Sequence, residues 1–172
     1  MKYLIVSDNH GVVSYLEDIK AKWLNDVDYF FHCGDSELSP KDDIWSTFHV
    51  VRGNCDYYQE YDTVEVIETS EDKVLLTHGH LFNVNMTFDK LLYQAEEVQA
   101  NIVLYGHTHQ LFVDMVDDIL LLNPGSISQP RGKYSYLKTY AIITHQSDGY
   151  LVEYYNERHE LQKELTHFFL MD

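Results

Sequence analysis

The amino-acid sequence predicts an α/β fold in a single domain covering residues 1–172. The chain has 172 residues, of which 45% are hydrophobic, enough for one sizeable core. In the first part, short β-rich apolar runs alternate with segments of helical spacing, whereas the last third consists of strands that follow one another directly. Strands that alternate with helices indicate an α/β domain, and consecutive strands indicate antiparallel pairing. We therefore expect an α/β domain with a mostly antiparallel C-terminal part.

Strands in the first part of the chain are predicted from short apolar runs that stop at polar or glycine-containing turns. The polar segment SEDK, residues 70–73, separates two of these runs and predicts a hairpin turn between them. The predicted strands are KYLIVS (2–7), VDYFFHC (27–33), FHVV (48–51), YDTVEVIET (61–69), VLLT (74–77) and NIVLY (101–105).

Two helices are predicted from apolar residues that recur on one helical face. The first follows the turn-like NHG segment and has its apolar positions at Val12, Leu16, Ile19 and Trp23. The second covers residues 87–99 and has its apolar positions at Phe88, Leu91, Leu92, Ala95 and Val98.

The last third of the chain is predicted to be mostly antiparallel strand. Its runs are separated by an aspartate pair, by the loop PGSISQPRGKYS and by QSDG, without intervening helices. The spacing of Leu161, Leu165 and Phe168 predicts one short final helix. The predicted strands are LFVDMV (111–116), ILLLN (119–123), TYAIITH (139–145) and YLVEYY (150–155).

The charge of the chain argues against two classes of partner. Lysine and arginine number 12 and aspartate and glutamate 28, which gives a net charge of −16. Such a surface repels long nucleic acids and anionic membranes, because both are bound through basic side chains. No apolar run approaches the roughly 20 residues that cross a bilayer. Cys33 and Cys55 are too few for a disulfide framework, so we expect reduced thiols and a cytoplasmic protein.

Polar residues with metal-ligand chemistry follow five of the apolar runs. Loops at the carboxyl ends of strands in an open α/β sheet converge on one crevice, so these residues are expected to meet. Each short fragment alone is compatible with an ordinary solvated loop, whereas the ordered series indicates a site. The candidate metal ligands are Asp8, His10, Asp35, Asn54, His78, His107 and His109.

Seven ligands are too many for one small cation and suit a pair of divalent metals with a shared carboxylate. Two metals about 3.5–4 Å apart activate a bridging water, which attacks phosphorus in line. They also neutralise charge on the phosphoryl oxygens. Oxygen and imidazole ligands without thiolate suit Mn²⁺, Fe²⁺, Zn²⁺, Ni²⁺ or Co²⁺.

The motif series resembles that of the calcineurin-like metallophosphoesterases. It consists, in this order, of D-x-H, G-D, G-N-x-D, H-G-H and G-H-T-H. The GNCD variant at 53–56 and the NPGS segment at 123–126 are similar to the small bacterial and archaeal phosphodiesterase branch. This resemblance implies a four-layer α/β/β/α sandwich of two mixed β-sheets flanked by helices. It also implies manganese and a dimer or tetramer.

The resemblance also implies a role for each ligand. Asp8, His10 and His109 would hold the first metal, Asn54, His78 and His107 would hold the second, and Asp35 would bridge the two. The function implied is hydrolysis of small phosphodiesters by a dinuclear centre, with Asp35 and Asn54 also taking part in catalysis.

One position departs from the wider family. Many relatives have histidine after the motif asparagine, where this chain has Cys55, and a neutral thiol is a poor proton donor. His80 is therefore a candidate catalytic acid or phosphate contact, with an ordinary loop residue as the equal alternative. Asp56 is expected to orient its loop rather than bind metal.

Two other functions remain open from sequence. The first is a protein-binding scaffold that keeps the fold without catalysis, which the complete ligand set disfavours. The second is a phosphomonoesterase, which Cys55 disfavours. The natural substrate is not determined by the sequence.

Overall fold

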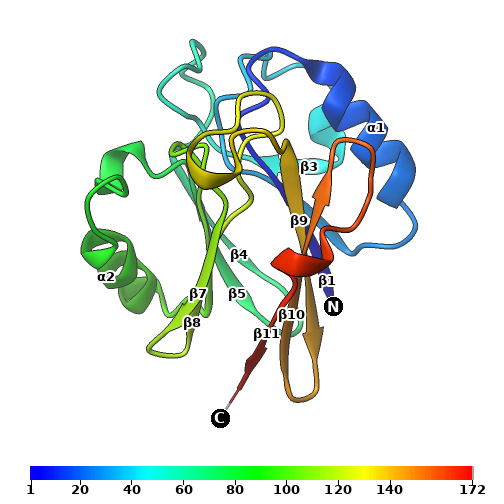
Figure 1. Ribbon diagram of the computed structural model, residues 1–172. Coiled ribbons are helices and arrows are strands. Elements are labelled where there is room, and N and C mark those ends of the chain that lie inside the picture. Colours follow the sequence, from blue (N-terminus) through cyan, green and yellow to red (C-terminus); the bar gives the residue numbers. More distant parts are fainter. Residues whose placement is uncertain (172) are drawn as a thin grey trace.

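The computed structural model describes residues 1–171, which form two β-sheets packed face to face (Figure 1). The strands of the six-stranded sheet are β1 (Lys2–Val6), β2 (Tyr29–His32), β3 (Phe48–Val50), β9 (Thr139–Gln146), β10 (Gly149–Asn156) and β11 (His167–Leu170). The strands of the five-stranded sheet are β4 (Val64–Glu68), β5 (Lys73–Thr77), β6 (Ile102–Leu104), β7 (Phe112–Val116) and β8 (Ile119–Asn123).

Both sheets are mixed. The first has the strand order β11-β10-β9-β1-β2-β3, in which β1, β2 and β3 are parallel and β9, β10 and β11 pair antiparallel. The second has the order β4-β5-β6-β8-β7, with a parallel centre and an antiparallel strand at each edge. The predicted hairpin at residues 70–73 is confirmed, because β4 and β5 are antiparallel neighbours.

Two α-helices cover the outer faces of the sheets. Helix α1 (Val13–Trp23) buries Leu16 and Ile19 against the six-stranded sheet, and α2 (Asp89–Val98) buries Leu91 and Ala95 against the five-stranded sheet. They lie on opposite sides of the molecule in Figure 1. The short 3-10 helices are η1 (Asp43–Ser46), η2 (His80–Phe82), η3 (Gly132–Tyr134) and η4 (Lys163–Leu165).

The main core lies between the two sheets, and the alternation of side chains along each strand explains it. In β1, Tyr3 and Ile5 point into the space between the sheets, whereas Leu4 and Val6 pack with α1. Leu75 of β5 likewise faces α2 while its neighbours face the other sheet. The predicted four-layer α/β/β/α sandwich is confirmed.

The predicted final helix is wrong. Leu165 ends a single 3-10 turn, η4, and Phe168 lies in β11, where it pairs opposite Leu151 of β10. The local spacing was helical, but the free edge of β10 offers backbone hydrogen bonds to an extended chain, so tertiary pairing prevails. Among residues 1–171, no helix is both long and apolar enough to span a bilayer.

A buried polar cluster joins the sheets at the edge where the parallel strands begin. Its centre is Asp72, just before β5, whose Oδ2 accepts hydrogen bonds from Tyr3 Oη (2.5 Å) and His145 Nδ1 (2.7 Å). Its Oδ1 accepts from Tyr150 Oη (2.5 Å) and Asn101 Nδ2 (2.8 Å). Each carboxylate oxygen therefore has two partners, and we name this group the Asp72 cluster.

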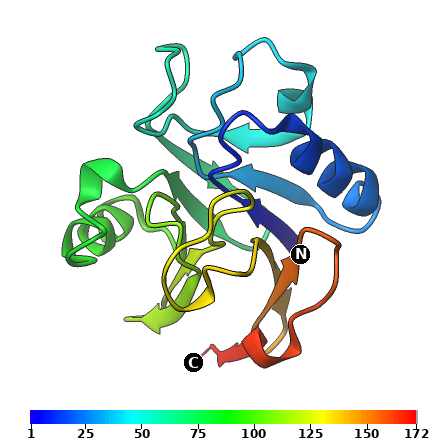
Figure 2. The same ribbon diagram turned by 45° about the horizontal axis from the view of Figure 1, so that its top comes forward.

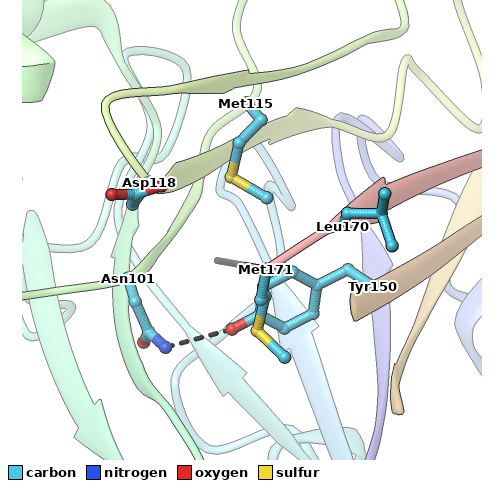
Figure 3. Close-up of a pocket in the computed structure, with 6 residues that line it drawn as sticks. All are labelled: Asn101, Met115, Asp118, Tyr150, Leu170 and Met171. Atoms are coloured by element: carbon cyan, nitrogen blue, oxygen red, sulfur yellow. Dashed lines mark hydrogen bonds between the residues drawn. The ribbon is translucent and has the colours of Figure 1, made fainter. Parts of the chain in front are cut away.

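A cavity of about 240 Å³ lies beside the Asp72 cluster (Figure 3). The hydrogen bond from Asn101 Nδ2 to Tyr150 Oη, 3.0 Å long, forms part of its wall. Because these polar atoms are already bonded to one another or to Asp72, the cavity presents few free polar groups. Its other lining residues are Met115, Asp118, Leu170 and Met171.

Candidate metal centre

The predicted ligands come from the loops that follow β1, β2, β3, β5 and β6. Strands β1, β2 and β3 are parallel, as are β5 and β6, and their loops lie in the upper part of the molecule in Figure 1, which comes forward in Figure 2. The five loops therefore meet at one edge, opposite the Asp72 cluster. This arrangement is the one expected for the carboxyl ends of strands in an α/β fold.

Four of the predicted ligands form a tight group. Asp8, His10, Asp35 and His109 each offer one ligand atom, and these four atoms all lie within 4.8 Å of one another. The Nε2 atoms of His10 and His109 are 3.1 Å apart, and Asp8 Oδ1 lies 3.2 Å from His109 Nε2. Three lone-pair-bearing atoms at such distances form a convergent set of donors for a cation.

The remaining three predicted ligands adjoin this group through Asp35. His78 Nε2 lies 3.3 Å from Asp35 Oδ2 and 3.1 Å from Asn54 Oδ1. The ring of His107 is 5.2 Å from that of His78, measured between centroids. Asp35 therefore borders both groups, and the structure brings all seven predicted ligands to one place.

Asp8 contains a buried carboxylate oxygen without a hydrogen-bond partner. Its side chain is fully buried, and Oδ2 accepts hydrogen bonds from Ser7 Oγ and the His107 backbone N–H, but Oδ1 has none. Leaving a buried polar group without a partner costs roughly 1–3 kcal/mol, and more for a charged group. A cation bound beside Oδ1 would remove this cost. Among residues 1–171, the only other such side-chain atom is His80 Nδ1.

The outer nitrogens of three histidines define the tautomers of their rings. His78 Nδ1 donates to the Cys33 carbonyl and His109 Nδ1 to the Gln129 carbonyl, each at 2.7 Å. A carbonyl only accepts, so Nδ1 carries a proton, and Nε2 is the atom that can present a lone pair to the centre when the ring is neutral. His10 Nδ1 lies 2.6 Å from Glu37 Oε1 and is oriented in the same way.

Asp56 fixes the loops after β2 and β3, as predicted. Its buried carboxylate accepts hydrogen bonds from the backbone N–H groups of Asp35 (2.8 Å), Glu37 (2.7 Å) and Gly53 (2.7 Å). It thereby sets the position of Asp35 without itself reaching the group of ligands. The prediction that Asp56 orients its loop is confirmed.

Two glycines allow the close approach of these loops. A Cβ atom at Gly53 would lie 2.0 Å from Asp35 Oδ1, and one at Gly106 would lie 2.1 Å from Ser7 Oγ and 2.8 Å from Asp8 Oδ2. Both carboxylates are therefore held where any larger residue would displace them.

The backbone of the site is strained. Five of the seven predicted ligands have left-handed backbone conformations, which L-residues rarely adopt and which are enriched at functional sites. They are Asp8 (φ 56°), His10 (44°), Asp35 (54°), His107 (68°) and His109 (58°). The turns after the strands thus point these side chains toward one another at an energetic cost.

The charges of the site are strongly coupled. Burial raises the pKa of Asp35, but hydrogen bonding to His78 and to Cys55 outweighs it, so the pKa lies below its usual range. Burial lowers the pKa of His78, yet Asp35 and Asp8 raise it above its usual value. Burial and the neighbouring histidines lower the pKa of both His80 and His107.

Cys55 is exposed and sits beside Asp35. Burial of part of the thiol and the nearby Asp35 carboxylate raise its pKa to about 11, so it is neutral at pH 7. Its backbone N–H donates to Asp35 Oδ1 at 2.8 Å. His80 lies in η2, with its ring 5.4 Å from that of His78 and 6.2 Å from that of His107.

Two residues near the ligands were missed from the sequence. His32, at the end of β2, accepts from the Gly34 N–H through Nδ1 and holds Asn9 Oδ1 at 2.8 Å through Nε2. Its burial lowers its pKa to about 4, so the ring is neutral. Glu37 contacts His10 from the neighbouring loop. Neither stands in a motif, and only the folded contacts identify them.

The sequence matches the profile of the calcineurin-like phosphoesterase superfamily domain over residues 1–148. The chain belongs to this superfamily. It is 35% identical over 170 residues to the probable metallophosphoesterase YsnB of Bacillus subtilis, covering 96% of this chain and 99% of the relative. The resemblance predicted from the motifs is confirmed, and the chain is a metallophosphoesterase by family.

Solved structures and a second relative extend this result. A conserved protein of Streptococcus pneumoniae described as a predicted phosphoesterase is 39% identical, with a TM-score of 0.95 and coverage of 99% of this chain and 97% of that one. Phosphodiesterase YfcE of Escherichia coli is 26% identical and covers 77% of this chain and 82% of the relative. Vps29 of Entamoeba histolytica shares the fold over both full chains, with a TM-score of 0.75 at 21% identity.

Proposed function

We propose that this metallophosphoesterase is a dinuclear, metal-dependent phosphodiesterase that hydrolyses small phosphodiesters. The observation that carries the proposal is the buried Asp8 Oδ1, which has no protein partner inside a group of convergent donors. A cation at this position would compensate the carboxylate and accept the lone pairs of His10 and His109. The residues present therefore fit a metal.

We assign the first metal to Asp8, His10 and His109 and the second to Asn54, His78 and His107, with Asp35 shared. The assignment is supported by the contacts of Asp35, which borders both groups. The donors are oxygen and imidazole, which suits Mn²⁺, Fe²⁺, Zn²⁺, Ni²⁺ or Co²⁺. We propose Mn²⁺ among these on the resemblance to the family. When bound, two such ions acidify a shared water and neutralise charge on the phosphoryl group.

Backbone carbonyls and one carboxylate around the ligands hold them in place and orient them. The carbonyls of Cys33 and Gln129 keep the lone pairs of His78 and His109 directed inward. Asp56 holds the backbone of Asp35. Preorganised ligands of this kind avoid a reorganisation step when substrate arrives. We propose that His80, at the rim beside His78 and His107, contacts a substrate phosphoryl oxygen.

We propose a diester substrate, and we expect Cys55 to set a preference among leaving groups. A neutral thiol beside Asn54 is a weak donor to a departing alkoxide, so esters with good leaving groups suit this site better. The relative YfcE is named a phosphodiesterase, which agrees with this choice. The net charge of −16 favours small substrates over long nucleic acids. We further propose a cytoplasmic protein that forms a dimer or tetramer.

The proposal is tested with bis(p-nitrophenyl) phosphate and p-nitrophenyl phosphate. The protein is stripped of metal, reloaded with Mn²⁺, and its kcat/KM for each ester and its metals per chain are measured. We expect two metals per chain, Mn²⁺-dependent hydrolysis and a preference for the diester. Two bound metals with no hydrolysis of either ester would instead support a scaffold, and preference for the monoester would support a phosphomonoesterase.

A further inference from the structure

Glu37 contacts one of the proposed metal ligands from the side that faces away from the centre. Its Oε1 atom lies 2.6 Å from His10 Nδ1, while His10 Nε2 faces His109 Nε2 and Asp8 Oδ1. The His10 side chain is 10% exposed and that of Glu37 is 41% exposed. Glu37 comes from the loop after β2 and His10 from the loop after β1, so the contact links two loops.

The hydrogen-bond partner of His10 Nδ1 differs in kind from the partners of His78 Nδ1 and His109 Nδ1. His78 and His109 donate from Nδ1 to backbone carbonyls, which are neutral. His10 donates to a carboxylate, which makes the imidazole more electron-rich and strengthens Nε2 as a ligand. Among these three histidines, only His10 therefore has an outer partner that is both charged and a side chain.

The backbone of Glu37 is held in an unfavourable conformation. Its φ is 56°, although glutamate has no local preference for the left-handed region. The backbone N–H of Glu37 donates to Asp56 Oδ1 at 2.7 Å, and the other oxygen of Asp56 holds Asp35. The same buried carboxylate thus sets the positions of Glu37 and of the shared ligand.

Stability alone does not explain this arrangement. A hydrogen bond to a carboxylate as exposed as Glu37 adds little to folding stability, because water competes for the carboxylate, whereas a left-handed backbone at a non-glycine residue is unfavourable. The expected net contribution to folding is zero or unfavourable. Strain that persists in such a case is found where a side chain serves a site.

We propose that Glu37 is a positioning residue for His10 and sets the affinity of the first metal site. It fixes the Nδ1–H tautomer of His10 and increases the donor strength of Nε2, without contacting metal or substrate. The inference rests on the metal assignment proposed above. Loss of such an outer partner typically weakens metal binding about 10- to 100-fold.

An alternative use of the same residues is a separate metal site. His10, Glu37 and Cys55 also offer three ligand atoms within 4.8 Å of one another. A metal there would need the Nδ1 lone pair of His10 and the Cys55 thiolate. The two arrangements are exclusive, because Nδ1 is either a donor to Glu37 or a metal ligand. Replacement of Cys55 distinguishes them.

The experiment compares Glu37→Gln and Glu37→Ala with Cys55→Ser and with Glu71→Gln, an exposed control in the β4–β5 turn. Metal-free protein is titrated with Mn²⁺ by calorimetry, the Co²⁺-loaded protein is followed by its visible absorption, and thermal unfolding of the metal-free protein is recorded. We expect one of the two dissociation constants to rise about 10- to 100-fold in the Glu37 variants but not in Cys55→Ser, and neither to change in Glu71→Gln. Saturating Mn²⁺ should restore kcat.

Three results would overturn the inference. The first is unchanged Mn²⁺ affinity in both Glu37 variants. The second is an equal loss of affinity in Cys55→Ser, which would support the separate site. The third is a fall in the melting temperature of metal-free Glu37→Gln with no specific loss of one metal, which would indicate a structural role. If the wild type itself binds no Mn²⁺, the proposed function fails, and the role of Glu37, which rests on it, fails with it.

Discussion

Two buried carboxylates at opposite ends of the sandwich differ in how far the protein satisfies them. Both oxygens of Asp72 have two hydrogen-bond partners each, drawn from both sheets. Asp8 Oδ1 has no partner, although His109 Nε2 lies only 3.2 Å away. Both side chains are fully buried. The two carboxylates are therefore equally buried, but only Asp72 has hydrogen-bond donors for both of its oxygens.

This difference distinguishes a structural polar cluster from a binding site. A satisfied buried network stabilises one arrangement of the chain, and the Asp72 cluster fastens the β4–β5 turn to β1, β9 and β10. An unsatisfied buried group is rare in native proteins and needs an explanation such as an ion. The comparison also explains why the cavity beside Asp72 carries no proposed ligand. Four predictions test it.

The largest effect is expected for Asp35→Asn. Asp35 borders both groups of proposed ligands, so loss of its charge should weaken both metals and lower kcat/KM on the order of 10³-fold, about 4 kcal/mol. Metal analysis and hydrolysis of bis(p-nitrophenyl) phosphate provide the measurement, with Asp62→Asn, an exposed position, as control. Two retained metals and near-normal turnover would show that Asp35 is not shared.

Neutralising the two contrasting carboxylates should change stability in opposite directions. Asp72→Asn replaces a charged acceptor of four hydrogen bonds and should lower the unfolding free energy by about 3 kcal/mol. Asp8→Asn places an amide beside His109 Nε2, which can accept from it, and should raise the stability of the metal-free protein by about 1 kcal/mol. Urea unfolding of both metal-free variants measures this, and destabilisation of equal size would refute the distinction.

The contribution of Asp72 should depend on pH. Burial raises the pKa of Asp72, but hydrogen bonds from Tyr150, Tyr3 and His145 outweigh it, so the folded pKa is lowered. A lowered pKa adds stability above the unfolded value of about 3.9 and loses it as pH falls through the folded value. The stability difference between wild type and Asp72→Asn should therefore shrink as the pH falls from 7 through the folded pKa of Asp72. A difference that stays constant would contradict the assignment.

The smallest effect is expected for Cys55→His, which concerns the chemistry of the proposed metal centre. An imidazole beside Asn54 should protonate a leaving alkoxide better than the neutral thiol and raise kcat/KM about tenfold for alkyl esters, with little effect on aryl esters. Plots of log kcat/KM against leaving-group pKa for both proteins, with metal content checked, provide the test. Parallel slopes would mean that position 55 does not serve the leaving group.

The parts of the fold that depend on local pattern could be predicted from the sequence. The strands before Asp8, Asp35 and His78 and the apolar faces of α1 and α2 agree with the structure, because alternation and helical spacing report burial directly. The predicted ligands meet because the carboxyl ends of parallel strands lie at one edge of a sheet.

The contacts that depend on distant segments could not be predicted. Phe168 lies in a strand because β10 has a free edge, which local spacing does not reveal. Glu37 and His32 act through partners 27 and 23 residues away, and Asp72 is bonded to Tyr150 across 78 residues. A single glutamate or aspartate in a loop carries no local signal of such a contact.

The left-handed backbone at five ligands has a consequence for mutagenesis. Alanine is not a neutral replacement at Asp8 or Asp35, because it keeps the Cβ atom that makes this conformation unfavourable and lacks the polar group that makes it tolerable. Glycine removes the same side chain and the steric conflict with it. Alanine and glycine variants at one position therefore differ by a single methyl group. The difference between their unfolding free energies, about 1 kcal/mol, measures the backbone strain in that turn.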